Sequence, residues 1–201
     1  MDLLKSFLNL HPNSRLSGKL KPRNNFEMVD SKIIAFQHFE LFSKWVDKLD
    51  ITDDPASYYE FKLMFRGSRD RFGKFHEICD NQPRIITIIK VKDCDRIVGG
   101  YSPIGWNAAV GDYSKTRESF IFSFGNSDSN ENYILSRVVN EYQAIWNSRA
   151  YGPTFGDKDL VLYGDNFCSS YSKKCDYEKP IRETEDEFSV EEIEVFQITK
   201  T

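Results

Sequence analysis

RIITIIKVKDCDRIVGGY, residues 84–101, contains two short β-like runs separated by a polar loop. The runs 84–91 and 96–101 are rich in Ile and Val and are bounded by turn residues, which is typical of strands. The loop between them, 92–95, is short enough to close a hairpin. The stretch therefore predicts two adjacent antiparallel strands.

Further runs of the same kind occur on both sides of this hairpin. Each is rich in Ile, Val, Phe and Tyr and is bounded by turn residues. They are 61–65, 119–124, 133–139, 142–146, 159–163 and 193–198. Strands and helices do not alternate as they do around a parallel sheet. The predicted fold class is α+β, mainly antiparallel β, with a few flanking helices.

A helical pattern at 30–50 precedes the strands. Apolar residues recur there at the spacing of one helix face, and they are Ala35, Phe39, Phe42, Val46 and Leu49. Asp30 and Ser31 stand just before this stripe and are predicted to cap the helix N-terminus. We expect an amphipathic helix that leads into a domain at 58–198 and packs one face on it.

The length and composition indicate one folded domain that does not bind nucleic acid. The chain has 201 residues, of which 40% are hydrophobic and 14% aromatic, and its net charge is -4. A chain of this size buries a substantial core, and an acidic balance provides no positive field for DNA or RNA. No apolar stretch approaches the roughly 20 residues of a membrane helix. The N-terminus does not look like a signal peptide, so we expect an intracellular protein, cytoplasmic or alternatively nuclear.

Cysteine and glycine patterns predict neither a metal nor a cofactor. The four cysteines, Cys79, Cys94, Cys168 and Cys175, form no Cys-x-x-Cys pair and have no histidine at zinc-ligand spacing. The glycines at 99–100 and 152–156 do not match a nucleotide-binding loop, and glycine within a strand more often marks a bulge or a close backbone approach. The acidic residues near the C-terminus do not match a calcium-binding loop. Reduced thiols and no cofactor are expected.

Ser68, Asp70 and His76 lie within nine residues and raise the question of a hydrolase triad. A nucleophilic serine usually sits in a Gly-x-Ser-x-Gly elbow, which is not present here. Residues 70–80 look helical, and Ser68 is placed to cap that helix. Capping is the favoured interpretation, and no catalytic residue is predicted.

Charge is unevenly distributed along the chain. Residues 1–29 form a basic segment and linker, whereas the region before the C-terminus is acidic. A solvated loop followed by a strand is the simplest explanation of the acidic region, and a docking surface for a protein partner is the alternative. The candidate partner-binding residues are Glu183, Glu185, Asp186, Glu187, Glu191, Glu192 and Glu194.

Seven strings in order resemble the TLDc (TBC/LysM-associated) domain family. They are FKLMFRGSRD (61–70), FHEICD (75–80), TIIK (87–90), IVGGY (97–101), FIFSF (120–124), GPTFG (152–156) before DL (159–160), and EIEVF (192–196). Within them, the motif residues expected to be structural are Arg66, Gly67, Ser68, Asp70, Gly99, Gly100, Gly152, Gly156, Glu194 and Phe196. The sequence departs from the animal pattern at 150–153, where a longer glycine run is usual. It is most similar to the fungal set in which TLDc follows BTB and BACK-type domains, and residues 1–25 resemble the end of such a preceding region.

The resemblance implies a β-sandwich of two antiparallel sheets with helices around it. It also implies a role in resistance to oxidative stress, as in the oxidation resistance proteins, and binding to the vacuolar proton ATPase (V-ATPase) in several relatives. The family brings no established catalytic residues and no cofactor. The sequence contains no stretch that resembles a BTB module, so an adaptor role through that module is not carried over.

Three functional hypotheses follow. The preferred one is a non-enzymatic protein-interaction domain. The second is a thiol-based antioxidant or another enzyme activity, using Cys79 or Cys94. The third is a truncated paralogue that retains the fold without an activity. The sequence does not indicate the oligomeric state or the identity of a partner.

Overall fold

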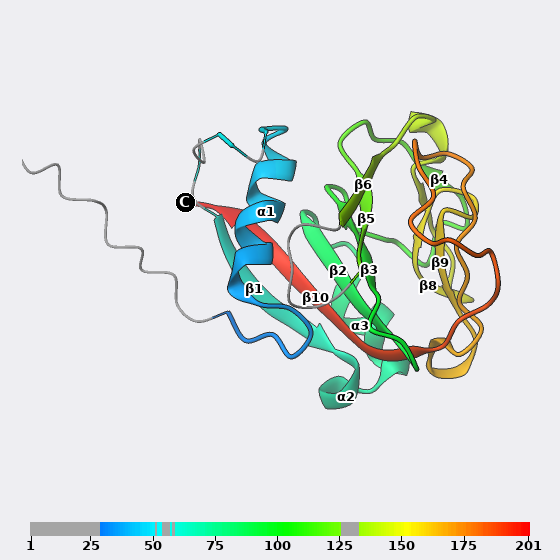
Figure 1. Ribbon diagram of the computed structural model, residues 1–201. Coiled ribbons are helices and arrows are strands. Elements are labelled where there is room, and N and C mark those ends of the chain that lie inside the picture. Colours follow the sequence, from blue (N-terminus) through cyan, green and yellow to red (C-terminus); the bar gives the residue numbers. More distant parts are fainter. Residues whose placement is uncertain (1–28, 51, 54–56, 58, 126–132) are drawn as a thin grey trace, which may run out of the picture.

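The computed structural model describes residues 29–50, 52–53, 57, 59–125 and 133–201. Its largest feature is a six-stranded antiparallel sheet in the order β1-β10-β2-β3-β5-β6. The strands are β1 Tyr59–Arg66, β2 Ile85–Val91, β3 Ile97–Ser102, β5 Phe120–Phe124, β6 Tyr133–Arg137 and β10 Val190–Lys200. The last strand, β10, lies between β1 and β2 (Figure 1). The predicted basic segment at 1–29 falls, except for Val29, outside the described residues.

A second antiparallel sheet has four short strands in the order β4-β7-β8-β9. They are β4 Tyr113–Ser114, β7 Ile145–Trp146, β8 Tyr151–Phe155 and β9 Leu160–Tyr163. Side chains of both sheets share one buried cluster, to which the large sheet contributes Ile89 and Val195 and the small sheet Phe155 and Leu162. The expected mainly antiparallel α+β fold with two packed sheets is therefore confirmed.

Helix α1, Phe36–Val46, covers the other face of the large sheet (Figure 1). Its rings of Phe39, Phe42 and Trp45 pack against aromatic side chains of β1, β10, β5 and β6. A second buried cluster forms there. Phe39, Phe42 and Val46 of the predicted stripe thus face the sheet, whereas Ala35 and Leu49 lie outside the helix and Ala35 is exposed. Helix α1 is an integral part of the core. The remaining helices are short: α2 Gly67–Asp70, η1 Phe72–Lys74, α3 Phe75–Cys79, η2 Glu141–Gln143 and η3 Asp165–Phe167.

Strand β2, IITIIKV, is apolar except at Thr87 and Lys90, and this follows from its position between the two clusters. Ile85 and Ile89 face the small sheet, whereas Ile86 and Ile88 face α1. A strand buried on both faces needs apolar residues at most positions, because successive side chains alternate between faces. The neighbouring strand β3 carries glycine where the backbone of β2 comes close, since a Cβ at Gly99 would lie 2.1 Å from the carbonyl oxygen of Thr87. The expectation of a close backbone approach is confirmed there.

The predicted cap of the first helix is wrong. Helix α1 begins at Phe36 after Ala35, five residues beyond Ser31, and Ala35 makes no side-chain capping bond. The Ser31 hydroxyl accepts hydrogen bonds from the amides of Ile33 and Ile34, so it closes a separate turn before the helix. Tertiary partners described below hold Asp30 and Ser31 in that turn.

The predicted helix at 70–80 and its cap also need correction. The segment is divided into α2, η1 and α3, and Ser68 lies inside α2 instead of at its N-cap. The break falls at Arg71, whose φ of 71° and ψ of 132° cannot continue a helix. Strands β4 and β8 were not predicted, because β4 has two residues and β8 contains Gly152 and Pro153, which both disfavour strands. Of the predicted strand at 142–146, the first two residues belong to the 3-10 helix η2, and only Ile145–Trp146 pair as β7.

Candidate functional site

A buried ion pair joins the end of β1 to the middle of β10. Arg66 Nε donates to Oε1 of Glu194 at 2.7 Å, and the Glu194 side chain is completely buried. The other end of the guanidinium binds Asp30, donating to its carbonyl oxygen at 2.7 Å and to its carboxylate at 3.0 and 3.2 Å. The hydrogen bond from Arg66 lowers the pKa of Asp30 below its ordinary value. Arg66 therefore connects three segments of the chain.

The Glu194 carboxylate also holds the segment before α1 in place, through both of its oxygens. Ser31 Oγ donates to Oε2 at 2.6 Å, and the Lys32 amide donates to Oε1 at 2.9 Å. A buried charge is tolerated only when it is paired and hydrogen-bonded, and Glu194 meets both conditions. We call Asp30, Ser31, Arg66 and Glu194 the Arg66 clamp. Glu194 is thus separated from the other six acidic candidates and acts inside the fold.

The rest of the 66–70 motif shapes the corner after β1. Asp70 Oδ2 accepts the Arg66 amide at 2.9 Å, and its carboxylate also binds the Arg69 guanidinium. The Ser68 amide donates to Glu192 Oε1 at 3.1 Å, which ties the corner to β10. These contacts give Asp70 and Glu192 structural partners.

The structure does not assemble the sequence-adjacent serine, aspartate and histidine into a triad. His76 Nδ1 lies 2.9 Å from Oδ1 of Asp80, and Nε2 lies 2.7 Å from the carbonyl oxygen of Tyr151. Both ring nitrogens are therefore engaged away from Ser68. A general base must be within hydrogen-bond reach of its nucleophile, and His76 instead connects α3 to β8.

The remaining family-motif residues lie in the interior. A Cβ at Gly67 or Gly152 would come within 2.9 or 2.5 Å of a phenylalanine ring. Gly156 adopts a φ of +65°, which disfavours residues with a Cβ. Phe196 is fully buried against α1. These positions support packing.

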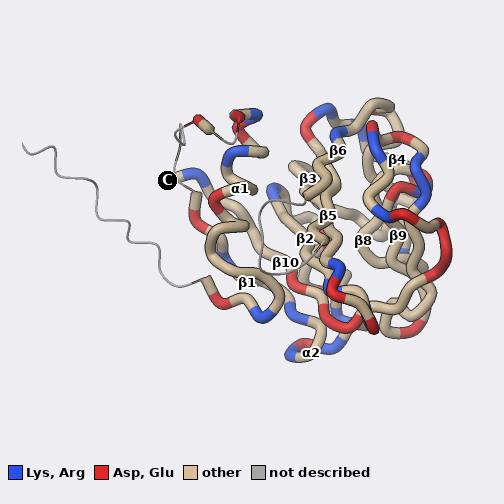
Figure 2. Tube along the Cα trace, viewed as in Figure 1, with Lys and Arg blue, Asp and Glu red and all other residues tan. Residues whose placement is uncertain are grey.

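The acidic segment before β10 is partly neutralised by the chain itself. Three of its glutamates bind basic side chains at 2.8–2.9 Å, in the pairs Glu183–Arg96, Glu185–Lys173 and Glu191–Lys90. Asp186 and Glu187 are exposed, and no side-chain ion pair is described for either. Figure 2 shows the acidic residues along the loop that leads into β10. The free negative charge of this surface is therefore centred on these two side chains.

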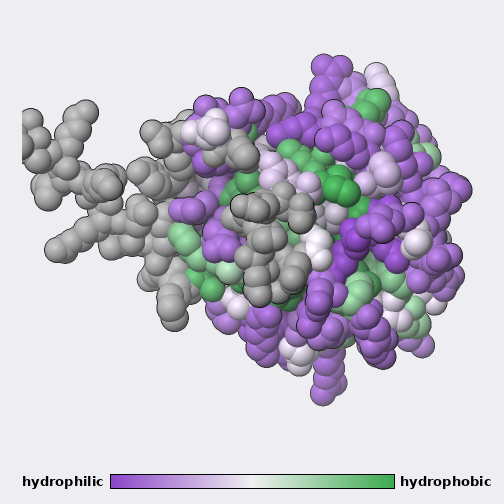
Figure 3. All heavy atoms as spheres, in the orientation of Figure 1, coloured by the Kyte–Doolittle hydropathy of each residue, from purple (hydrophilic) through white to green (hydrophobic). Residues whose placement is uncertain are grey.

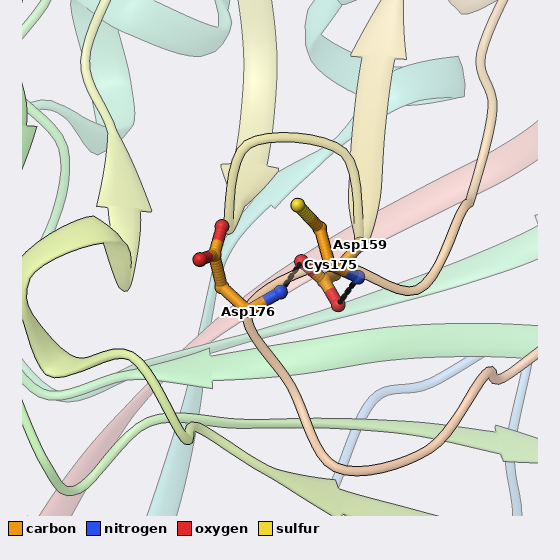
Figure 4. A group of neighbouring side chains, drawn as sticks. All are labelled: Asp159, Cys175 and Asp176. Atoms are coloured by element: carbon orange, nitrogen blue, oxygen red, sulfur yellow. Dashed lines mark hydrogen bonds between the residues drawn. The ribbon is translucent and has the colours of Figure 1, made fainter.

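Three potential metal ligands that the sequence patterns did not indicate meet beside the start of β9, which Asp159 directly precedes. The ligand atoms of Asp159, Cys175 and Asp176 lie within 4.8 Å of one another (Figure 4). The Asp159 carboxylate already accepts the amides of Cys175, Asp176 and Tyr177 at 2.8–3.0 Å. Burial raises the pKa of Asp159, while these amides favour its charged form. This arrangement fits a structural staple of the 175–177 segment.

Asp176, the second carboxylate of that group, has further partners. Its Oδ1 accepts the Asn140 side-chain amide at 2.9 Å, and its Oδ2 accepts the Asp157 amide at 2.8 Å. A cation would have to displace these donors. No sequence signal predicted the staple, because its members are 16 and 17 residues apart and match no ligand spacing.

The four thiols differ in accessibility. Cys79 is fully buried, and burial raises its pKa to about 12, so it is a poor nucleophile. Burial and nearby aspartates also raise the pKa of Cys175. Cys94, Cys168 and Cys175 are exposed, and none of the four forms a disulfide.

The chain is a mainly-β domain, with two antiparallel sheets around a shared core and a buried ionic clamp. The side chains considered as catalytic candidates make structural contacts within it. The model of the TLDc domain matches residues 28–199, so the chain belongs to the TLDc domain family. The match includes α1 and the Arg66 clamp. None of the curated proteins compared with the chain matches it. Among the described residues, no helix is both long and apolar enough to cross a membrane.

Proposed function

We propose that this TLDc domain is a non-enzymatic protein-interaction module. One observation supports the proposal: the polar side chains of the family motifs bind other parts of the same chain. They are Arg66, Asp70, His76 and Glu194. Their arrangement supports a rigid scaffold instead of an acid, base or nucleophile. Function is then expected on the surface.

The finer expectations come from the family resemblance. We propose a role in oxidative-stress resistance through contact with V-ATPase subunits, in an intracellular compartment, cytoplasmic or nuclear. We also propose that the chain groups with the fungal relatives in which TLDc follows BTB and BACK-type domains. The first surface to test is the acidic segment, with Asp186 and Glu187 as its least neutralised members.

Affinity purification from cell extract tests this proposal. The protein is compared with Asp186→Asn/Glu187→Gln, and Glu40→Gln/Glu60→Gln serves as a control with the same change in net charge at other exposed sites. We expect stoichiometric V-ATPase subunits with the unchanged protein and the control, and a several-fold loss with the first pair. Recovery of no stoichiometric partner would contradict the interaction proposal as a whole. Equal recovery of V-ATPase subunits with all three proteins would exclude only the acidic segment as the binding surface.

Direct reaction with peroxide is the second candidate function, and the exposure of Cys94 favours it over a role for Cys79. Cys94→Ser is compared with Cys168→Ser, which alters another exposed thiol. Loss of peroxide protection only in Cys94→Ser would support the thiol mechanism. Unchanged peroxide protection with all four cysteines replaced by serine would exclude the thiol mechanism. Absence of both partner binding and peroxide protection would favour a paralogue that retains only the fold.

A further inference from the structure

The loop after β6 presents the most exposed of the large hydrophobic side chains in the described part of the chain. Val139 is 69% exposed and Tyr142 is 66% exposed. They border a surface hollow of about 520 Å³ that is lined by Arg117 and residues 138–142. Figure 3 shows one face of the molecule, which is largely hydrophilic with separate hydrophobic patches. Single exposed apolar residues are common, but two beside one hollow are a more specific feature.

The loop that forms the hollow is held in place by its backbone. The amides of Val139 and Asn140 donate to the carbonyl oxygen of Asp176 at 2.7 and 3.1 Å. The carbonyl oxygen of Glu141 accepts the Thr116 amide at 3.0 Å. Because these bonds attach the loop at both ends, the apolar side chains are displayed in a defined position and lose little freedom when they bind.

The acidic and the basic side chains around the hollow differ in exposure. Lys115 Nζ and the Arg117 guanidinium both bind the Glu141 carboxylate. The Glu141 side chain is only 13% exposed, whereas those of Lys115 and Arg117 are 52% and 78% exposed. Lys115 Nζ also lies 4.1 Å from the centre of the Tyr142 ring. The carboxylate thus faces inward, and the surface offers two cations beside an aromatic ring.

We infer that Lys115, Arg117, Val139 and Tyr142 bind an acidic protein segment that carries an apolar or aromatic anchor residue. The anchor fills the hollow against Val139 and Tyr142, and flanking carboxylates of the partner pair with Arg117 and Lys115. Tyrosine and arginine dominate binding energy in many interfaces, and complementary charge selects the partner. The inference rests on the proposed interaction function and adds the chemistry of the partner.

The first test uses a fluorescein-labelled peptide, DEDFEDE, and the full chain. We expect saturable binding that weakens between about 50 and 300 mM salt, because surface charges are screened. Replacing the central Phe by Ala in the peptide, or using the basic peptide KRKFKRK, should abolish binding. In a ¹⁵N-labelled sample, the amide shifts should move at 115–117 and 138–142. The inference is overturned if DEDFEDE shows no saturable binding up to about 1 mM, or if the shifts move elsewhere.

The second test uses surface variants that retain the fold, as checked by circular dichroism. Val139→Ser/Tyr142→Ser should lower the affinity for DEDFEDE about tenfold, a loss typical of truncated interface anchors. The control Val110→Ser/Tyr163→Ser removes exposed residues of the same types elsewhere and should not change it. Equal affinities for the two variants would refute the inference. If V-ATPase subunits still co-purify with Val139→Ser/Tyr142→Ser, the proposed interaction function uses another surface of the domain.

Discussion

Arg66 Nε lies 2.7 Å from Oε1 of Glu194, a residue 128 positions later in the chain, and both side chains are at least 94% buried. The pair closes β1 onto β10 and, through Asp30, attaches the segment before α1. A single buried guanidinium therefore connects the start and the end of the domain.

Removing one member of this pair should be strongly destabilising. For Glu194→Ala we expect a loss of about 3–5 kcal/mol in the free energy of unfolding, because Arg66 would keep a buried charge without its innermost partner. Asp30→Ala should cost less, since the Asp30 side chain is mostly exposed and its carbonyl contact remains. Urea unfolding followed by tryptophan fluorescence measures both. A loss below about 1 kcal/mol for Glu194→Ala would show that the clamp is dispensable.

Arg71→Gly should stabilise the protein. Arg71 has a φ of 71° and a ψ of 132°, a region that is nearly restricted to glycine and costs other residues about 1–3 kcal/mol. The greater freedom of glycine in the unfolded chain offsets part of this gain, so we expect a net increase of about 1 kcal/mol. The control is Arg71→Ala, which removes the guanidinium but keeps the strained Cβ. A similar rise in melting temperature for both variants would mean that the side chain, not the backbone, is responsible.

Acidification should weaken the packing of α1. His38 is fully buried beside Phe124, its Nδ1 bonds the Ala35 carbonyl oxygen, and its Nε2 has no hydrogen-bond partner. Burial lowers the pKa of His38 below 6.5. The unfolded chain therefore takes up a proton that the folded chain does not, and stability falls as the pH drops below about 6.5, by up to about 1.4 kcal/mol per pH unit.

The measurement for His38 is the free energy of unfolding between pH 7.5 and 5. In His38→Asn the side-chain amide replaces the Nδ1–H donor without titrating, so the curve should be flatter. His76→Asn serves as the control histidine on the opposite side of the large sheet. If His38→Asn retains the full pH dependence, other groups are responsible for it.

The two adjacent glycines of β3 should differ in their tolerance of alanine. A Cβ at Gly99 meets the Thr87 carbonyl oxygen at 2.1 Å, whereas at Gly100 it meets the Phe155 ring at 2.6 Å. A ring can shift further than the backbone of a paired central strand, so we expect Gly99→Ala to be the more destabilising. Overpacking of this kind costs about 1–3 kcal/mol or more. Gly73→Ala, with no atom within 4 Å, should be nearly neutral, and thermal unfolding orders the three. The reverse order for Gly99 and Gly100 would contradict the account of sheet packing.

Local pattern alone predicted most strands and the face of the first helix. The run 84–101 forms β2 and β3 within one residue of the predicted ends, because burial on both faces favours a largely apolar sequence. The stripe of Phe39 and Phe42 points to the sheet as its period requires. These features depend on the spacing of apolar residues, which is present in the sequence before the chain folds.

Tertiary structure decided which polar residues belong to the surface and which to the core. Glu194 is one of seven acidic candidates in the sequence, yet it is buried because Arg66 lies opposite it across the β1–β10 pair. The residue types of Asp30 and Ser31 favour a helix N-cap, but both bind other residues of the clamp, and the helix begins only at Phe36. The burial of a charge depends on a counter-charge far away in the chain, and no local pattern contains that information. Composition and periodicity thus determined a mainly antiparallel β domain, whereas long-range pairing alone decided its clamp and its exposed surface.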